Sequence, residues 1–203
     1  NSHNLTQNRK VWIVGSSIIY WASKRAAVQL NSHLRLERLG VNISWMGRRG
    51  LKWDGAMYNI RKRLVENPPP QYIVLHVGSN DVTEIATAEL CVKVERDIHS
   101  LSQSLLSSKC ILVWSDLLPR LTWRGGNSVT AIEKKRKRVN RSGRKAVLAG
   151  GGRVIRHDDI TFDCPQLFRS DGVHLDDIGN AIFVNTLQGA LETFLTSTKL
   201  IFS

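Results

Sequence analysis

Four turn-like positions of the sequence hold a hydroxyl, an imidazole, a carboxylate and a side-chain amide. Ser16 and Ser17 follow a short apolar run, Asn80 lies in a Gly-Ser-Asn-Asp turn, and Asp171 precedes His174 by three residues. Acyl transfer needs a nucleophilic hydroxyl, a base to take its proton, a carboxylate to orient the base, and donors for the oxyanion. The sequence therefore contains the parts of a Ser-His-Asp site.

Each of these groups also has a purely structural interpretation. A buried Asn80 could satisfy loop carbonyls, Asp171 could cap a helix that begins near Asp176, and His174 could be a surface histidine. The order of the groups favours the catalytic interpretation, because each lies after a candidate strand or before the last candidate helix. An Asp and a His three residues apart in a turn also have their side chains on one face.

The elements that would position these groups follow from hydrophobic periodicity. Short β-rich runs lie at 11–14, 41–45, 72–76, 111–114 and 153–156. Longer helical patterns lie at 18–39, 53–66, 87–107, 131–149 and 176–196. Alternation of this kind predicts right-handed crossovers and a parallel sheet with helices on both faces. We therefore expect a flavodoxin-like, three-layer α/β/α sandwich with a five-stranded parallel sheet.

In such a sheet, loops at the carboxyl ends of the strands meet at one edge, where ligands bind. Glycine-rich or polar turns follow the first three predicted strands, and one of them is the turn 47–50. We expect an N-terminal tail at 1–9 and a single domain at 10–199, cut from a longer chain. The polar start of the sequence has no apolar signal core, and no apolar run is long enough for a membrane span. An intracellular location, cytoplasmic or nuclear, is the corresponding expectation.

Four segments in this order resemble the sequence blocks of the SGNH/GDSL hydrolases. VWIVGSSII resembles the first block, WMGRRG the second, HVGSND the third and DGVHL the last. The resemblance extends over most of the chain, and the third and last blocks are its specific part. Ser16 stands where the family has an Asp, and it offers a second hydroxyl beside the expected nucleophile.

The resemblance implies a role for each matching residue. Ser17 would be the nucleophile, His174 the base and Asp171 its orienting carboxylate. The oxyanion hole would take N–H donors from Ser17, from Gly50 and from the Asn80 side chain, with Gly47 as the alternative to Gly50.

Two narrower likenesses concern particular families of esterases. The segment Leu117–Arg120 after the fourth predicted strand resembles intracellular platelet-activating-factor acetylhydrolases. The first block and the basic segment resemble esterase domains carried by some retrotransposons. Short acyl groups such as acetyl, on lipid or sugar esters, are the substrates that these likenesses imply.

The sequence predicts neither a cofactor nor a metal site. Walker A and dinucleotide-binding patterns are absent, and the three cysteines have no CxxC spacing. The segment 157–159 could hold a metal, but an exposed turn is the favoured interpretation. Trp12, Trp45 and Trp114 are expected in the core. The other three, Trp21, Trp53 and Trp123, could line an acyl pocket or be buried under helices.

The positive charge of the chain is concentrated in one segment. Net charge is +12, and residues 134–145 carry eight basic side chains and no acid. This basic segment consists of Lys134, Lys135, Arg136, Lys137, Arg138, Arg141, Arg144 and Lys145. A solvated helix face, a surface that attracts the phosphates of RNA or anionic lipid, and a nuclear-import signal are its three interpretations.

The sequence as a whole predicts a serine esterase that hydrolyses carboxylic esters. The alternative is a catalytically silent module of the same fold that binds nucleic acid or anionic lipid through its basic segment. A small acyl ester is the expected substrate. The sequence is compatible with a homo-oligomer but does not determine the oligomeric state.

Overall fold

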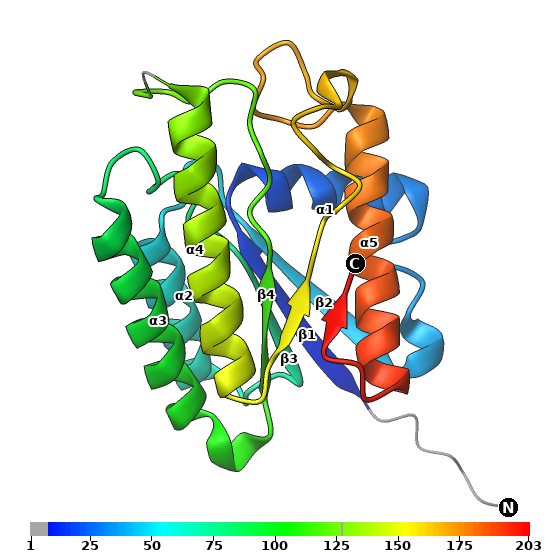
Figure 1. The fold of residues 1–203 in the computed structure, drawn as a ribbon. Coiled ribbons are helices and arrows are strands. Elements are labelled where there is room, and N and C mark those ends of the chain that lie inside the picture. The colour runs from blue at the N-terminus through cyan, green and yellow to red at the C-terminus, as the bar shows by residue number, and fades with distance from the viewer. Residues whose placement is uncertain (1–7, 127) are drawn as a thin grey trace, which may run out of the picture.

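In the computed structural model, which describes residues 8–126 and 128–203, helices cover both faces of one sheet (Figure 1). The strands are β1 (Arg9–Gly15), β2 (Val41–Gly47), β3 (Tyr72–His76), β4 (Ile111–Ser115), β5 (Arg153–Ile155) and β6 (Ile201–Phe202). They lie in the order β2-β1-β3-β4-β5-β6, and every neighbouring pair is parallel. The predicted α/β/α sandwich with a parallel sheet is confirmed.

The sheet has six strands where the sequence predicted five. In β6, Ile201 pairs with Val154 of β5, beyond residue 199, where the domain was expected to end. A strand of two residues shows no alternation of apolar and polar side chains, and only its pairing with β5 defines it. This is why hydrophobic periodicity did not find it.

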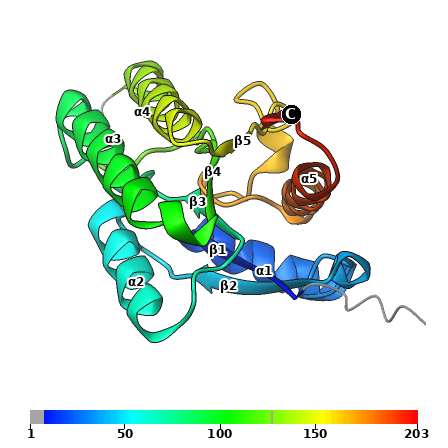
Figure 2. The same ribbon diagram turned by 90° about the horizontal axis from the view of Figure 1, so that it is seen from below.

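The helices form two layers. They are α1 (Ser17–Gln29), α2 (Trp53–Glu66), α3 (Thr87–Ser104), α4 (Val129–Ala149) and α5 (Asp177–Thr196). Helices α1 and α5 cover one face of the sheet, and α2, α3 and α4 cover the other (Figure 2). None of the helices among the described residues is long and apolar enough to cross a membrane.

Helix α1 ends ten residues earlier than the periodicity predicted. The Asn31 side chain accepts hydrogen bonds from the backbone N–H groups of His33 and Arg35. Leu34 and Arg35 have φ values of 55° and 53°, outside the helical region. A local side-chain-to-backbone turn of this kind competes with helix formation, so the apolar pattern continues while the helix does not.

The central strands have side chains in two hydrophobic cores. In β1, Val11 and Ile13 pack in the core beneath α1 and α5, whereas Trp12 and Val14 pack beneath α2, α3 and α4. Every residue of β3 is buried. Strands covered on both faces need nearly continuous apolar sequence, as the first and third runs have.

A pair of buried histidines lies at the carboxyl ends of β3 and β5, on either side of Ser115 at the end of β4. Ser115 Oγ is 3.0 Å from His76 Nδ1 and 2.7 Å from His157 Nε2. The His157 ring stacks on Phe183 with a centroid separation of 4.6 Å. Burial lowers the pKa of His76 to about 3 and the pKa of His157 well below its usual value. Both rings are therefore neutral in the folded protein.

This pair predicts a loss of stability on mild acidification. Below pH 6.5 the unfolded chain binds protons at these histidines and the folded protein does not, so the stability falls as the pH drops toward 3. The slope is about 1.4 kcal/mol per pH unit for each histidine. Urea unfolding between pH 7 and 5 measures it, and His157→Phe should reduce the slope. An equal slope in that variant would contradict the prediction.

Candidate active site

The predicted site residues lie at the carboxyl edge of the sheet. Ser17 begins α1 directly after β1, the turn 47–50 follows β2, and Asn80 follows β3. The segment with Asp171 and His174 lies just before α5. The turn after β2 is tied to the end of β1, because the Arg48 N–H donates to the Gly15 carbonyl over 3.0 Å.

Ser17, His174 and Asp171 form one chain of contacts. Ser17 Oγ lies 3.0 Å from His174 Nε2, and His174 Nδ1 lies 2.6 Å from Asp171 Oδ2. A hydroxyl, an imidazole and a carboxylate connected in this order are the arrangement that allows a serine to be deprotonated. The hydroxyl also lies at a helix N-terminus, where free N–H groups favour negative charge.

A tight turn holds the carboxylate against the imidazole. Asp171 Oδ1 accepts hydrogen bonds from the backbone N–H groups of Val173, at 2.8 Å, and His174, at 2.9 Å. Gly172 has a φ of 67°, which favours glycine at this position. The cap of α5 is Asp176, which accepts from the Gly179 N–H, so the capping interpretation of Asp171 is wrong.

The environment of Asp171 keeps its carboxylate ionised. Partial burial by itself would raise the pKa of Asp171, but hydrogen bonds from the His174 ring and from the backbone N–H groups of His174 and Val173 lower it to about 2. The side chain of Asp171 is 46 % exposed. A charged carboxylate beside Nδ1 favours the tautomer whose Nε2 can accept a proton.

The two adjacent serines differ in access to solvent. Ser16 is buried, at 3 % exposed, and its side chain makes no capping hydrogen bond to α1. Ser17 is half-buried and contacts His174. Of the two hydroxyls, only that of Ser17 contacts the imidazole.

The two glycines proposed for the second block have different structural requirements. At Gly47 a Cβ would lie 2.4 Å from the Tyr20 backbone nitrogen, so a close approach requires this glycine. Gly50 has open space around it and a φ of 74°. A close backbone approach thus requires glycine at position 47, whereas at position 50 the positive φ favours glycine. Within the described chain the Gly50 N–H makes no hydrogen bond, which leaves it free to donate.

Asn80 is held between two loops. Its Nδ2 donates to the Leu51 carbonyl over 3.0 Å, and its Oδ1 accepts from Arg120 over 3.2 Å. The hydrogen bond to Leu51 agrees with the interpretation of Asn80 as a residue that satisfies loop carbonyls. It uses one of the two amide hydrogens, and the other remains available.

Arg120 is a contact that the sequence did not predict, although it ends the segment 117–120. Its guanidinium lies 4.7 Å from the centre of the Trp123 ring. Burial lowers the pKa of Arg120 to about 10, against the opposing effect of the Asp171 charge. The Arg120 guanidinium, which donates to Asn80, therefore lies close enough to Asp171 for the charge of that carboxylate to raise its pKa.

One of the six tryptophans, Trp45, departs from the prediction. Trp12 and Trp114 are core residues as expected, but Trp45 is only half-buried. Trp53 and Trp123, two of the three candidates for an acyl pocket, are buried. Trp21 is half-buried and its ring faces two guanidinium groups, those of Arg49 at 5.0 Å and Arg169 at 4.5 Å.

A second serine–histidine contact lies inside the core. Ser115, which contacts His157, has no exposed surface, so a substrate cannot reach it without unfolding. No cluster of three metal-ligating side chains occurs among residues 8–126 and 128–203.

No protein-family model matches the sequence, and no curated protein is significantly similar to it. Solved structures do match. A GDSL-like lipase from Bacteroides thetaiotaomicron has a TM-score of 0.70 at 14 % identity, covering 95 % of this chain and 92 % of the other. A lipolytic protein of the G-D-S-L family from Veillonella parvula has a TM-score of 0.66 at 19 % identity, covering 93 % and 99 %.

A psychrotrophic esterase, EstA from a Pseudoalteromonas species, has a TM-score of 0.64 at 13 % identity and covers 93 % of this chain and 100 % of the other. At these identities the similarity concerns the path of the backbone. The chain therefore has the fold of the GDSL-like lipases and acylhydrolases.

Proposed function

We propose that this protein is a serine esterase of the SGNH/GDSL type that hydrolyses carboxylic esters with short acyl groups. The observation that carries the proposal is the contact chain from Ser17 Oγ through His174 to the ionised Asp171. The similarity in fold to lipases and esterases and the sequence blocks around these residues support it.

The reaction begins with attack of Ser17 Oγ on the ester carbonyl. His174 Nε2 takes the hydroxyl proton, and Asp171 stabilises the imidazolium that forms. The oxyanion accepts hydrogen bonds from the Ser17 and Gly50 backbone N–H groups and from the free amide hydrogen of Asn80.

His174 then gives its proton to the departing alkoxide, which leaves as the alcohol, and the acyl group remains bound to Ser17. A water molecule attacks the acyl-enzyme while His174 takes its proton. His174 returns that proton to Ser17 as the carboxylic acid leaves, so the enzyme ends in its starting state.

Hydrolysis of p-nitrophenyl acetate and covalent labelling with a fluorophosphonate test this function together. We expect turnover and one phosphonyl group per chain. The solved structure of EstA was inhibited by monoethylphosphonate, so a phosphonate probe is suited to this fold. If neither hydrolysis nor labelling occurs in the folded protein, the chain is the silent module that the sequence left as the alternative.

Asn80→Ala is expected to lower kcat by about 10²–10³-fold with a smaller change in KM. The reason is that the amide donates to charge that exists only in the transition state. Steady-state kinetics on p-nitrophenyl acetate measure both constants. A change confined to KM would instead identify Asn80 as a contact to the bound substrate.

Arg120→Met is expected to lower kcat by about tenfold, with KM nearly unchanged, because the amide of Asn80 loses the hydrogen bond that orients it. Arg120 acts here as a positioning residue. In the background of Asn80→Ala the same substitution should have little further effect. Equal effects in both backgrounds would show that Arg120 acts independently of Asn80.

A further inference from the structure

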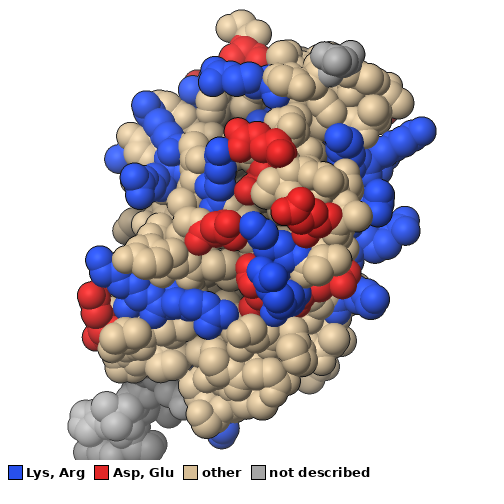
Figure 3. Space-filling model, turned by 90° about the vertical axis from the view of Figure 1, so that its left-hand side faces the viewer, with Lys and Arg blue, Asp and Glu red and all other residues tan. Residues whose placement is uncertain are grey.

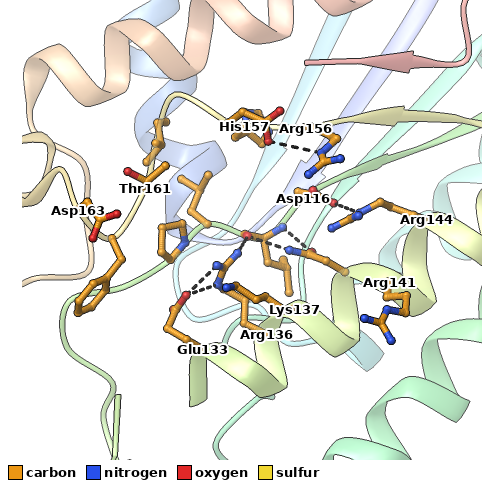
Figure 4. Close-up of a pocket in the computed structure, with 17 residues that line it drawn as sticks. Asp116, Glu133, Arg136, Lys137, Arg141, Arg144, Arg156, His157, Thr161 and Asp163 are labelled. Atoms are coloured by element: carbon orange, nitrogen blue, oxygen red, sulfur yellow. Dashed lines mark hydrogen bonds and ion pairs between the residues drawn. The ribbon is translucent and has the colours of Figure 1, made fainter. Parts of the chain in front are cut away.

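A cavity of about 530 Å³ lies between α4, the segment that follows β4, and the loop that follows β5 (Figure 4). Five basic side chains line it: Arg136, Lys137, Arg141, Arg144 and Arg156. Its wall also includes Leu118 and Pro119, which directly precede Arg120. Of the described residues that line it, none is Ser17, Asn80, Asp171 or His174, so the cavity is distinct from the candidate active site.

Helix α4 is held rigidly against the sheet, which gives the cavity a defined shape. At Gly143 a Cβ would lie 2.3 Å from the Trp114 ring, so only glycine allows this approach. The buried Asn140 accepts hydrogen bonds from Trp114 Nε1, at 3.2 Å, and from the Leu117 N–H, at 2.8 Å. The positions of the basic side chains of α4 are thus tied to the end of β4.

One of the five basic residues is occupied by structural contacts. Arg136 donates through Nε and Nη2 to Glu133 Oε2, at 2.9 and 2.7 Å. Its Nη1 donates to the Leu117 carbonyl over 2.7 Å. All three nitrogens therefore hold the wall of the cavity together, which leaves Arg136 only two of its five N–H donors.

The other four basic side chains retain more of their donors. Arg144 contacts Asp116 through Nε at 2.9 Å, and Arg156 contacts Asp158 through Nε at 3.4 Å. In the described part of the chain, the terminal nitrogens of both guanidinium groups make no hydrogen bond. Lys137 and Arg141 are exposed and form no ion pair with any described residue.

These donors come from two elements that border the cavity. Lys137, Arg141 and Arg144 are spaced by four and three residues on α4, which places them on one helix face, and Arg156 follows β5. Like charges at this spacing repel one another, and an anion between them would relieve the repulsion. Among the lining residues, two cations, Lys137 and Arg141, form no ion pair with a described residue, and only one acid, Asp163, is likewise unpaired. The lining therefore carries a net positive charge.

The lining of the cavity also includes a buried histidine. His157 lines the cavity, and its Nδ1 is a buried nitrogen with no hydrogen-bond partner within residues 8–126 and 128–203. Such buried polar atoms are rare in folded proteins and call for an explanation. Because this nitrogen has almost no solvent-accessible surface, a ligand in the cavity would not contact it.

We propose that this cavity binds a ligand that carries phosphate groups. A phosphate has more acceptor oxygens than a carboxylate, and guanidinium groups match its geometry. The volume lies in the range of small-molecule sites, and Leu118, Ile160 and Phe162 offer apolar contact to an organic portion. A soluble phosphorylated compound and a phosphorylated lipid headgroup share this chemistry.

Calorimetric titration with inorganic pyrophosphate at low ionic strength tests the proposal. The test variant is Lys137→Gln/Arg141→Gln, in the cavity lining. The control is Lys134→Gln/Arg138→Gln, on the outer surface of the same helix. Each pair combines one lysine and one arginine, four residues apart and exposed. Figure 3 shows Lys and Arg side chains projecting along the edge of the molecule where α4 runs.

We expect wild-type protein to bind pyrophosphate with a stoichiometry of one. The cavity variant should bind at least about tenfold more weakly, and the control within about twofold. Equal weakening in both variants would overturn the proposal and assign the charge to a general polyanion surface, as an RNA backbone would use. Absence of saturable binding to wild type would also overturn it.

Vesicles of phosphatidylcholine with and without phosphatidylinositol 4-phosphate distinguish the two sources of phosphate. Binding only to the phosphorylated vesicles, weakened in the cavity variant, supports a lipid headgroup. Binding of pyrophosphate without binding of either vesicle supports a soluble ligand. The pyrophosphate titration contains no carboxylic ester, and the vesicle measurement records binding and not hydrolysis. Failure of this proposal would therefore leave the esterase proposal untouched.

Discussion

Replacing Ser17 with alanine is expected to lower kcat for p-nitrophenyl acetate by about 10⁶-fold. Without Oγ no acyl-enzyme forms, and His174 has no hydroxyl to deprotonate. Oxyanion donors and substrate binding would still provide the small activity that remains when a catalytic serine is removed. The change removes one half-buried atom from a surface position, so the fold should persist, which circular dichroism can check.

Ser16→Ala is the matched control, since it deletes the same atom one residue earlier. Ser16 is buried and makes no capping hydrogen bond, so turnover should stay within a few-fold of wild type. Intact-mass spectrometry after fluorophosphonate treatment should find the label on wild type and Ser16→Ala alone. Labelling of Ser17→Ala would assign the nucleophile to another residue.

The second large effect is expected for Asp171→Asn, which should lower kcat by about 10⁴-fold. The backbone N–H groups of Val173 and His174 donate to Asp171 Oδ1. An asparagine that keeps these bonds must direct its NH₂ group toward His174 Nδ1. Nδ1 would then be the acceptor, and the proton would lie on Nε2, where it prevents the imidazole from accepting the proton of Ser17.

The measurement is kcat across pH, with Asp171→Glu as the variant that keeps the charge. The pKa of Asp171 is about 2, so the carboxylate is ionised throughout the range above pH 4. Any fall in wild-type activity between pH 7 and 4 must therefore arise from another group. If Asp171→Asn kept more than about a tenth of the activity, the carboxylate would not be what orients His174.

Hydrophobic periodicity was enough to predict the layers of this fold. Strands such as β3 are short apolar runs that are buried on both faces. Burial on both faces requires nearly continuous apolar residues, which can be recognised in the sequence. The turn with Asp171 and His174 is local as well, because three residues of chain suffice to bring the carboxylate to the imidazole. Features of this kind depend on neighbours in the sequence, so the sequence reveals them.

Contacts between distant residues were decided only by the tertiary structure. Ser17 and His174 are 157 residues apart, and their contact requires β1 and the turn before α5 to meet at one edge of the sheet. Burial separates Ser16 from Ser17, whereas in the sequence only the family resemblance distinguished the two hydroxyls. The hydrogen bond from Arg120 to Asn80 joins the loops after β4 and β3 in the same way.

Three further features could not be predicted from hydrophobic periodicity: the early end of α1, the strand β6 and the cavity beside α4. Periodicity records which side of an element is apolar, but it carries no information on backbone turns made by single side chains such as Asn31. Nor does it predict the pairing of a two-residue strand. The basic segment was evident as charge, whereas the docking of α4 against Trp114 and the position of Arg156 determine which of its side chains face a cavity. Packing between elements distant in sequence sets that choice, and no local pattern encodes it.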